Sequence, residues 1–304
     1  MSFSCRAPVS LSILVLLTAS MALEGQRVAP ARVETGKMLF FDVRLSADRS
    51  ISCATCHDPQ RGFADDRPLS IGVFGRKGER HVPSLIARGA GVSHFWDGRT
   101  PALVKQVLEP ITNPNEMDMT LAGALERLRA DAGFSALTTG ELAESLASYV
   151  RTIRSVDSPF DRFLRADANA LSAVEREGLR LFHDKARCYL CHSGDHFTDE
   201  DFHNTGVAWR GGRLLDAGRF RVTGKRYHNG AFKTPTLREI ARTPPYMHDG
   251  SLATLEEVIE FYDKGGNANP WLDENIEPLK LTMEEKRAVL AFLGALSGTV
   301  RDGL

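Results

Sequence analysis

Two stretches of the chain place apolar residues at helical spacing directly after a polar start signal. Thr138 with Glu141, and Thr282 with Glu285, both fit the T-x-x-E capping box. In this motif each side chain hydrogen-bonds to the other residue's backbone N–H, which starts a helix. The apolar positions that follow recur every three or four residues and predict helices that bury one face. They are Leu142, Leu146, Tyr149, Val150 and Ile153 after the first box, and Val289, Leu290, Phe292, Leu293 and Leu296 after the second.

A third capping box, from Thr254 to Glu257, opens another helical pattern with Leu255, Val258 and Ile259 on its apolar side. The strict alternation of apolar and polar residues that indicates strands is scarce throughout. We therefore expect an all-α, mainly helical fold.

The pattern repeats within the chain. The sequence G-x-x-L-F-x-D occurs at 36–42 and again at 178–184. Repetition at this separation predicts two homologous domains rather than a solenoid, an N-terminal one over 23–165 and a C-terminal one over 166–304. Further matches share a constant offset of 152 residues: 82–85 with 234–237, 95–98 with 247–250, and Leu103 with Leu255.

Composition and the N-terminal residues limit the possible partners and the location of the protein. The 304 residues carry a net charge of -1 and are 42% hydrophobic, which favours a soluble protein and gives no sign of nucleic acid or an anionic membrane as partner. Residues 1–22 resemble a signal peptide, with Arg6, an apolar run over 11–17 and small residues before Ala22. The run is shorter than the roughly 20 residues of a membrane span. We predict removal of 1–22, export to the periplasm and no membrane span afterwards; an uncleaved anchor is the alternative.

Five cysteines are present, and Cys5 leaves with the signal peptide. The other four form two C-x-x-C-H motifs, which is the c-type haem attachment pattern. In this pattern two thiols bond to the vinyl groups of one porphyrin, and the following imidazole binds the iron. Disulfides, a redox-active cysteine pair and half of a zinc site are the alternatives. The motifs predict two covalent haems, one on Cys53 and Cys56 with His57 as iron ligand, the other on Cys188 and Cys191 with His192.

Carried forward without a gap, the register of 152 places Pro110 opposite Tyr262. Proline has no side-chain donor for iron, whereas a tyrosine phenolate is a known haem ligand. If this position faces the haem, the first haem is open and the second is capped, an asymmetry that suits an enzyme better than an electron carrier. A packed core aromatic is the other interpretation of Tyr262.

These residues resemble the bacterial di-haem cytochrome c peroxidases and their MauG-like relatives, from Gly36 to the final helix. The marks of this resemblance are Phe40–Ser46, Phe95–Arg99, Glu109–Pro110 with Asn113–Met117, Phe232–Leu237 and Pro245–Gly250.

The resemblance implies roles for single residues. It makes the N-terminal haem the peroxide-reacting one and the C-terminal haem its six-coordinate partner. Trp96 matches the tryptophan that carries electrons between them. Tyr262 matches the second haem's distal ligand, with Met247 as its rival. The catalytic pocket around the open iron corresponds to Glu116, Gln106 and Pro110, with Glu116 as the acid that helps cleave the O–O bond.

Some positions depart from the family. Val73 stands where many of these peroxidases hold a histidine that blocks the active haem until reduction, so we expect an iron open without activation. The family's calcium site would use backbone carbonyls of Thr243 and Pro245, but His81 replaces its asparagine, and neutral imidazole suits a hard cation poorly. Ala186 replaces a surface tryptophan that one relative uses to oxidise its protein substrate. The remaining histidines, His94, His183, His196, His203, His228 and His248, are expected at the surface or in supporting positions.

Three functions fit these observations. The first is a periplasmic peroxidase that reduces hydrogen peroxide with electrons from a small cytochrome c or cupredoxin. The second is a MauG-like oxidase that uses peroxide to modify residues of a partner protein. The third is a non-enzymatic di-haem electron carrier.

Overall fold

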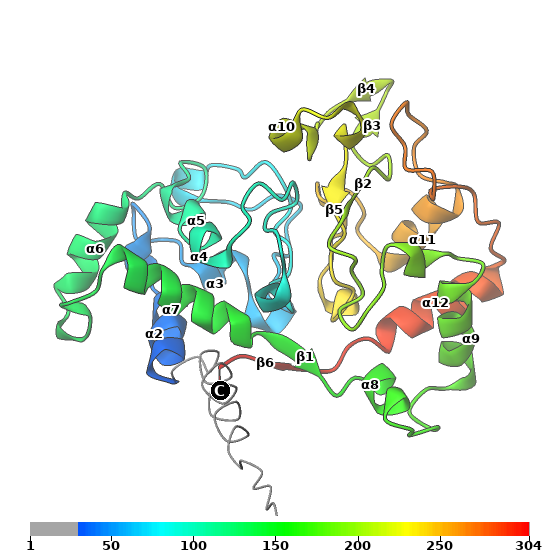
Figure 1. Ribbon diagram of the computed structural model, residues 1–304, viewed down its shortest axis with the longest axis horizontal. Helices are drawn as coiled ribbons and strands as arrows, with labels where there is room; N and C mark the ends of the chain where they lie inside the picture. Colours follow the sequence, from blue (N-terminus) through cyan, green and yellow to red (C-terminus); the bar gives the residue numbers. More distant parts are fainter. Residues whose placement is uncertain (1–29, 304) are drawn as a thin grey trace, which may run out of the picture.

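The computed structural model describes residues 30–303, so the predicted signal peptide lies outside the described residues. Two groups of helices lie side by side, one from each half of the chain (Figure 1). The helices of the first half are α2 (Pro30–Phe40), α3 (Cys53–Cys56), α4 (Leu103–Gln106), α5 (Glu109–Thr112), α6 (Leu121–Arg129) and α7 (Thr139–Thr152). The later helices are α8 (Pro159–Leu164), α9 (Ala173–His183), α10 (Phe220–Thr223), α11 (Leu255–Asp263) and α12 (Met283–Gly294).

The strands are short and form three antiparallel pairs, β1 with β6, β2 with β5 and β3 with β4. The mainly helical fold is therefore confirmed, although the chain is not purely α. Segments of two or three residues are too short for an alternating pattern to reveal them. The strands are β1 (Arg154–Val156), β2 (Phe202–His203), β3 (Trp209–Arg210), β4 (Arg213–Leu214), β5 (Phe232–Lys233) and β6 (Thr299–Arg301).

The last strand brings the C-terminus back to the first half of the chain. β6 pairs with β1, which directly follows α7 (Figure 1). Beyond β6, the Tyr149 hydroxyl on α7 donates to the Asp302 carboxylate at 2.6 Å. The final residues therefore attach to the N-terminal helices, a contact that the motif pattern did not predict.

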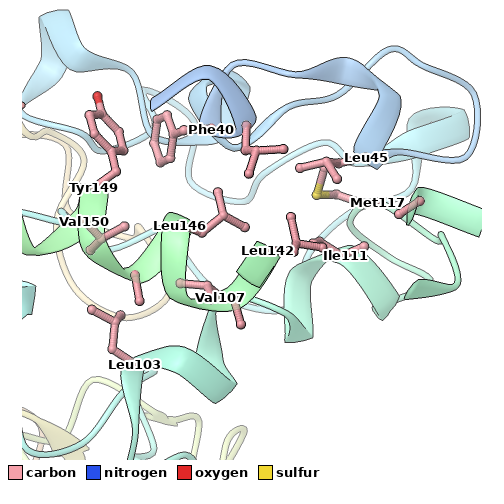
Figure 2. Close-up of a cluster of buried hydrophobic side chains, with 14 of the residues drawn as sticks. Phe40, Leu45, Leu103, Val107, Ile111, Met117, Leu142, Leu146, Tyr149 and Val150 are labelled. Atoms are coloured by element: carbon pink, nitrogen blue, oxygen red, sulfur yellow. The ribbon is translucent and has the colours of Figure 1, made fainter. Parts of the chain in front are cut away.

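Each half has its own hydrophobic cluster. In the first, Phe40 of α2 packs edge-to-face on Tyr149 of α7, and Leu142 and Leu146 extend the buried face of α7 (Figure 2). In the second, Phe182 of α9 and Phe292 of α12 make the same kind of contact at 5.2 Å between ring centroids. The apolar stripes predicted for α7 and α12 are thus buried against the helix that carries the G-x-x-L-F-x-D motif.

A glycine allows this helix crossing in both halves. A Cβ atom on Gly36 of α2 would lie 1.9 Å from the Ser145 carbonyl oxygen of α7. A Cβ atom on Gly178 of α9 would lie 1.9 Å from the Ala288 carbonyl oxygen of α12. The glycine that both copies of the motif share at their first position is therefore explained by close contact between two backbones.

All three predicted capping boxes are present. The hydroxyls of Thr138, Thr254 and Thr282 each accept a hydrogen bond, at 3.2 Å, from the backbone N–H of the glutamate three residues later. They start α7, α11 and α12. Within residues 30–303 no helix is both long and apolar enough to cross a bilayer.

The backbone confirms the register of 152 residues. Phe95 and Met247 both adopt a left-handed conformation, with φ of 66° and 74°. An isolated bridge joins His94 to Thr100 in the first half, and the matching bridge joins Tyr246 to Leu252 in the second. The two halves therefore share one chain path over this segment.

Candidate functional site

The two C-x-x-C-H motifs adopt the same local turn. The backbone N–H of His57 donates to the Cys53 carbonyl, and that of His192 to the Cys188 carbonyl, both at 2.9 Å. Each histidine also places its ring Nδ1 against a carbonyl oxygen, of Phe63 at 3.0 Å for His57 and of Phe197 at 2.9 Å for His192. A carbonyl partner requires a proton on Nδ1, so Nε2 keeps its lone pair for a metal. The hydrogen bond at Nδ1 thus orients both imidazoles and leaves Nε2 available, which is the arrangement of histidines that bind iron.

The cysteines are half-buried thiols without disulfides. Cys53, Cys56, Cys188 and Cys191 are all free. Burial raises the pKa of Cys53, Cys56 and Cys188 to about 12. A redox-active C-x-x-C pair needs a thiol pKa lowered toward neutrality, so this environment disfavours that alternative and fits covalent attachment to an apolar group.

Glu116 lies within electrostatic range of the first cysteine pair. Its negative charge is close enough to raise the pKa of both Cys53 and Cys56, as a smaller contribution than burial. Asn113 donates to Glu116 Oε1 at 2.7 Å, which opposes but does not cancel the burial that raises the Glu116 pKa. The structure therefore brings together the first haem motif and the carboxylate that the sequence singled out.

Pro110 ends the helix on this side of the first half. α4 stops at Gln106, and α5 starts with Glu109 and Pro110, whose ring nitrogen has no hydrogen to continue the helical ladder. The Pro110 carbonyl accepts from the N–H of Met117 at 3.2 Å, so the helix break is next to the Glu116 loop. Gln106 is the last residue of α4, four positions before Pro110, and is half-buried.

Val73 is packed against the same loop. Its side chain is fully buried, and its backbone N–H donates to the Glu116 carbonyl at 2.8 Å. The position that the resemblance compares with a blocking histidine is thus adjacent to Glu116 and carries an apolar side chain.

The second motif lines a cavity of about 270 Å³. Tyr262, near the end of α11, contributes its phenol ring, and Met247 also lines the cavity. Burial raises the pKa of Tyr262, and the charges of Cys191 and Cys188 add to this. An apolar cavity with two thiols, an imidazole with a free Nε2 and a phenol fits a covalently attached haem. The second-half residues at its haem-binding side include Cys188, Cys191, His192, Met247 and Tyr262.

Trp96 belongs to the first half but lines this same cavity. Its indole N–H donates to the His81 carbonyl at 2.7 Å, which fixes the ring. The cavity also reaches Ala64, which follows the residue whose carbonyl holds His57. Trp96 therefore lies at the junction of the two halves.

The calcium expectation gains no support from the donors at the site. Thr243, Pro245 and His81 all line the cavity, but His81 Nδ1 faces the Arg67 carbonyl at 3.0 Å and must carry a proton. Burial lowers the pKa of His81, so the ring is neutral. A neutral imidazole is a poor ligand for calcium, and calcium stays a prediction that these residues fit badly.

Sequence reasoning missed a cluster at the edge of the second site. His203 lies between the carboxylates of Asp199, at 3.0 Å, and Asp273, at 2.6 Å. These two hydrogen bonds raise the pKa of His203 to about 12, so it is protonated at neutral pH. Within the described residues, one group of three side chains could hold a metal ion, and it consists of Cys191, Asp199 and His203. Cys191, however, belongs to the haem motif. Asp273 is 70 residues from His203, and no spacing rule connects them.

Comparison with known proteins agrees with this geometry. A family model described as di-haem cytochrome c peroxidase matches residues 30–169. The methylamine utilization protein MauG of Methylorubrum extorquens is 38% identical over 283 residues, which cover 88% of this chain and 79% of that protein. Cytochrome c551 peroxidase of Nitrosomonas europaea is 34% identical over 281 residues, covering 88% of this chain and 80% of that one.

Solved structures agree as well. A MauG-like protein associated with microbial copper homeostasis superposes with a TM-score of 0.84 and 31% identity, over 90% of this chain and 91% of that one. The diheme peroxidase BthA of Burkholderia thailandensis has the same fold, with a TM-score of 0.79 and 23% identity over 90% of this chain and 87% of that one.

The chain belongs to the di-haem cytochrome c peroxidase family. It is an enzyme, a peroxide-dependent di-haem oxidoreductase that carries two covalently bound c-type haems.

Proposed function

We propose that the two haems divide the work, with peroxide reacting at the N-terminal half and electrons entering at the C-terminal half. Each half, 23–165 and 166–304, then holds one haem. The observation that carries this proposal is the difference between the groups that face the two motifs. A carboxylate, Glu116, is close to Cys53 and Cys56, whereas a phenol, Tyr262, is close to Cys188 and Cys191.

At the first site the chain supplies proton transfer. The haem, when bound, supplies an iron that exchanges electrons with peroxide. The Glu116 carboxylate takes the proton from the inner oxygen of hydrogen peroxide and returns it to the outer oxygen, so that water leaves. Burial excludes bulk water from this carboxylate, and Asn113 holds it in place. Gln106 and Pro110 border the pocket, and Val73 leaves the iron open without prior reduction.

At the second site the chain supplies two iron ligands, His192 and Tyr262. Tyr262 rather than Met247 is favoured because it matches Pro110 in the repeat and because α11 runs without a break up to it. Trp96 carries electrons from this site to the first half, which its place in the cavity wall supports.

Hydrogen peroxide is the oxidant, and a small cytochrome c or cupredoxin in the periplasm is the electron donor. Steady-state turnover of hydrogen peroxide with a reduced small cytochrome c tests this. We expect donor oxidation that saturates with donor concentration and stays well above the rate with free haem. Turnover no faster than free haem would contradict the proposal.

A MauG-like role is the second candidate, favoured by Tyr262 and Val73. A phenolate ligand lowers the reduction potential of an iron, which stabilises its oxidised state. The second haem would then hold oxidising equivalents for use on a partner protein rather than accept electrons from a donor. Mass spectrometry of a co-encoded partner after peroxide treatment distinguishes the two functions. A modified partner together with slow donor turnover supports this role, and an unmodified partner removes it.

A further inference from the structure

The two halves meet in a reciprocal arrangement. In the register of 152 residues, Trp96 matches His248 and His81 matches Lys233. The backbone N–H of His81 donates to the His248 carbonyl, and the backbone N–H of Lys233 donates to the Trp96 carbonyl, both at 2.8 Å. When residue i contacts j, and the equivalent of j contacts the equivalent of i, the interface follows an approximate two-fold axis. The two halves are therefore packed here like the subunits of a symmetric dimer.

Equivalent residues contact each other directly at such an axis. The rings of Trp96 and His248 meet edge-to-face, with 6.5 Å between centroids and 72° between planes. A second equivalent pair is also in contact, since the Arg80 guanidinium lies over the Phe232 ring at 5.3 Å from its centroid. The place that Trp96 occupies in the first half is thus occupied in the second half by an imidazole that touches it.

The His248 ring is held in a defined plane. It stacks on Phe232 of β5 at 3.6 Å between centroids, with 13° between planes. It is only 5% exposed, and it lines the cavity that contains Cys188 and Tyr262. His248 therefore lines the second haem cavity beside Trp96 and is in contact with its indole, with Phe232 fixing the orientation of the imidazole.

We propose that His248 is the second-half counterpart of Trp96 in the electron path, a positioning residue whose ring connects the indole to the second haem site. This rests on the proposed role of Trp96 as the carrier of electrons between the halves. In the step concerned, one electron moves from the second haem to the first, so the second is oxidised by one electron and the first reduced by one. Trp96 and His248 end unchanged, and no bond or proton is exchanged. A ring in contact with both sides couples them, because electronic coupling falls steeply across a gap.

The alternative is that His248 only fills space at the interface. The two roles differ in the result expected for an aromatic replacement. His248→Phe keeps a ring in the stack with Phe232, whereas His248→Leu keeps apolar volume but removes the ring. A packing role predicts that both variants behave alike, and a coupling role predicts that only the leucine variant is slow.

The test is the rate of electron equilibration between the haems of the purified holoenzyme after photoreduction of one of them. We expect His248→Leu to slow equilibration on the order of tenfold and His248→Phe to stay within about threefold of the parent. The ferric EPR signals and midpoint potentials of both haems should be unchanged, which a distorted site would not allow. His196→Leu is the matched control, since its side chain is exposed and outside the cavity. Should the leucine variant lose a haem, His248→Gln provides the same comparison.

Trp96→Phe separates the two claims. If it slows equilibration while His248→Leu does not, the role of His248 is wrong and the path through Trp96 stands. If neither variant slows equilibration, the proposed path itself is wrong. Equal slowing by His248→Leu and His248→Phe at unchanged potentials would also overturn the proposal.

Discussion

The two halves share one backbone path between equivalent positions up to Leu103 and Leu255. They differ in the helix that follows, which is interrupted in the first half and continuous in the second. In the second half, α11 begins with a capping box at Thr254 and runs without interruption to Asp263, which places Tyr262 on the cavity. In the first half, α4 has no side-chain cap and stops at Gln106, and a new short helix with Pro110 as its second residue begins at Glu109. In the proposed division of work, this helix break leaves Pro110 at the position of Tyr262, and proline cannot bind iron through its side chain.

The chain after the break carries Glu116, the group that we propose for proton transfer at the first site. The loop from Asn113 to Met117 returns to the Pro110 carbonyl and holds the Glu116 carboxylate near Cys53. The difference teaches that, on the proposed division, a duplicated scaffold acquires two functions through a few positions, while the attachment motif, the helix crossing and the left-handed turns stay the same.

Removing one attachment motif at a time gives the largest expected effect. Replacing both cysteines at 53 and 56 by alanine should leave one covalent haem and abolish peroxide turnover, because the peroxide-reacting centre is lost. Replacing those at 188 and 191 should also leave one haem, with peroxide binding intact and turnover with a donor lost. Intact-protein mass and peroxide difference spectra measure both. Equal peroxide binding by the two proteins would refute the division between the halves.

Glu116→Gln removes proton transfer but keeps shape and the hydrogen bond from Asn113. We expect the rate of reaction with hydrogen peroxide to fall on the order of 10²- to 10³-fold. Stopped-flow absorbance at the Soret band of the first haem measures it. Glu126→Gln, an exposed change on α6, is the control and should react like the parent. A parent-like rate in Glu116→Gln would show that the carboxylate is not the proton carrier.

The pH dependence of that same rate gives a smaller effect. Burial raises the Glu116 pKa above its usual range, and the ionised form is the one that accepts the peroxide proton. The rate should therefore fall as pH decreases through the raised pKa of Glu116, and this limb should be absent from Glu116→Gln. The same acid limb in both proteins would assign it to another group.

The sequence predicted the fold best where a pattern extends over many residues or repeats. The capping boxes at Thr138, Thr254 and Thr282 were predictable because local chemistry determines them, and the match of 95–98 with 247–250 was visible as a repeat, although the left-handed turns at Phe95 and Met247 were not predicted. The contacts of His203 with Asp273, and of Tyr149 with Asp302, were not, because they join residues 70 and 153 positions apart through tertiary packing. His248 was given only a supporting position, although the register that places it opposite Trp96 was already visible.

Substitutions at the two glycines where helices cross, Gly36 and Gly178, should have the smallest effect, and they test whether the two halves pack in the same way. Gly36→Ala and Gly178→Ala should each lower the free energy of unfolding by about 1–3 kcal/mol, because the added methyl group meets a carbonyl oxygen. Gly140→Ala is the control on α7, where a Cβ atom meets nothing within 4 Å, and it should be neutral or stabilising. Denaturant unfolding of the holoenzyme measures all three. A destabilised control with unaffected crossings would show that the scaffolds do not pack as described.

Ferric EPR of the purified enzyme and of its Tyr262→Met and Tyr262→Phe variants tests most directly whether the two irons differ. The account predicts one high-spin and one low-spin haem in the parent, with the low-spin signal altered in both variants and the high-spin signal unchanged. Two low-spin signals in the parent, or a low-spin signal that neither substitution alters, would contradict it.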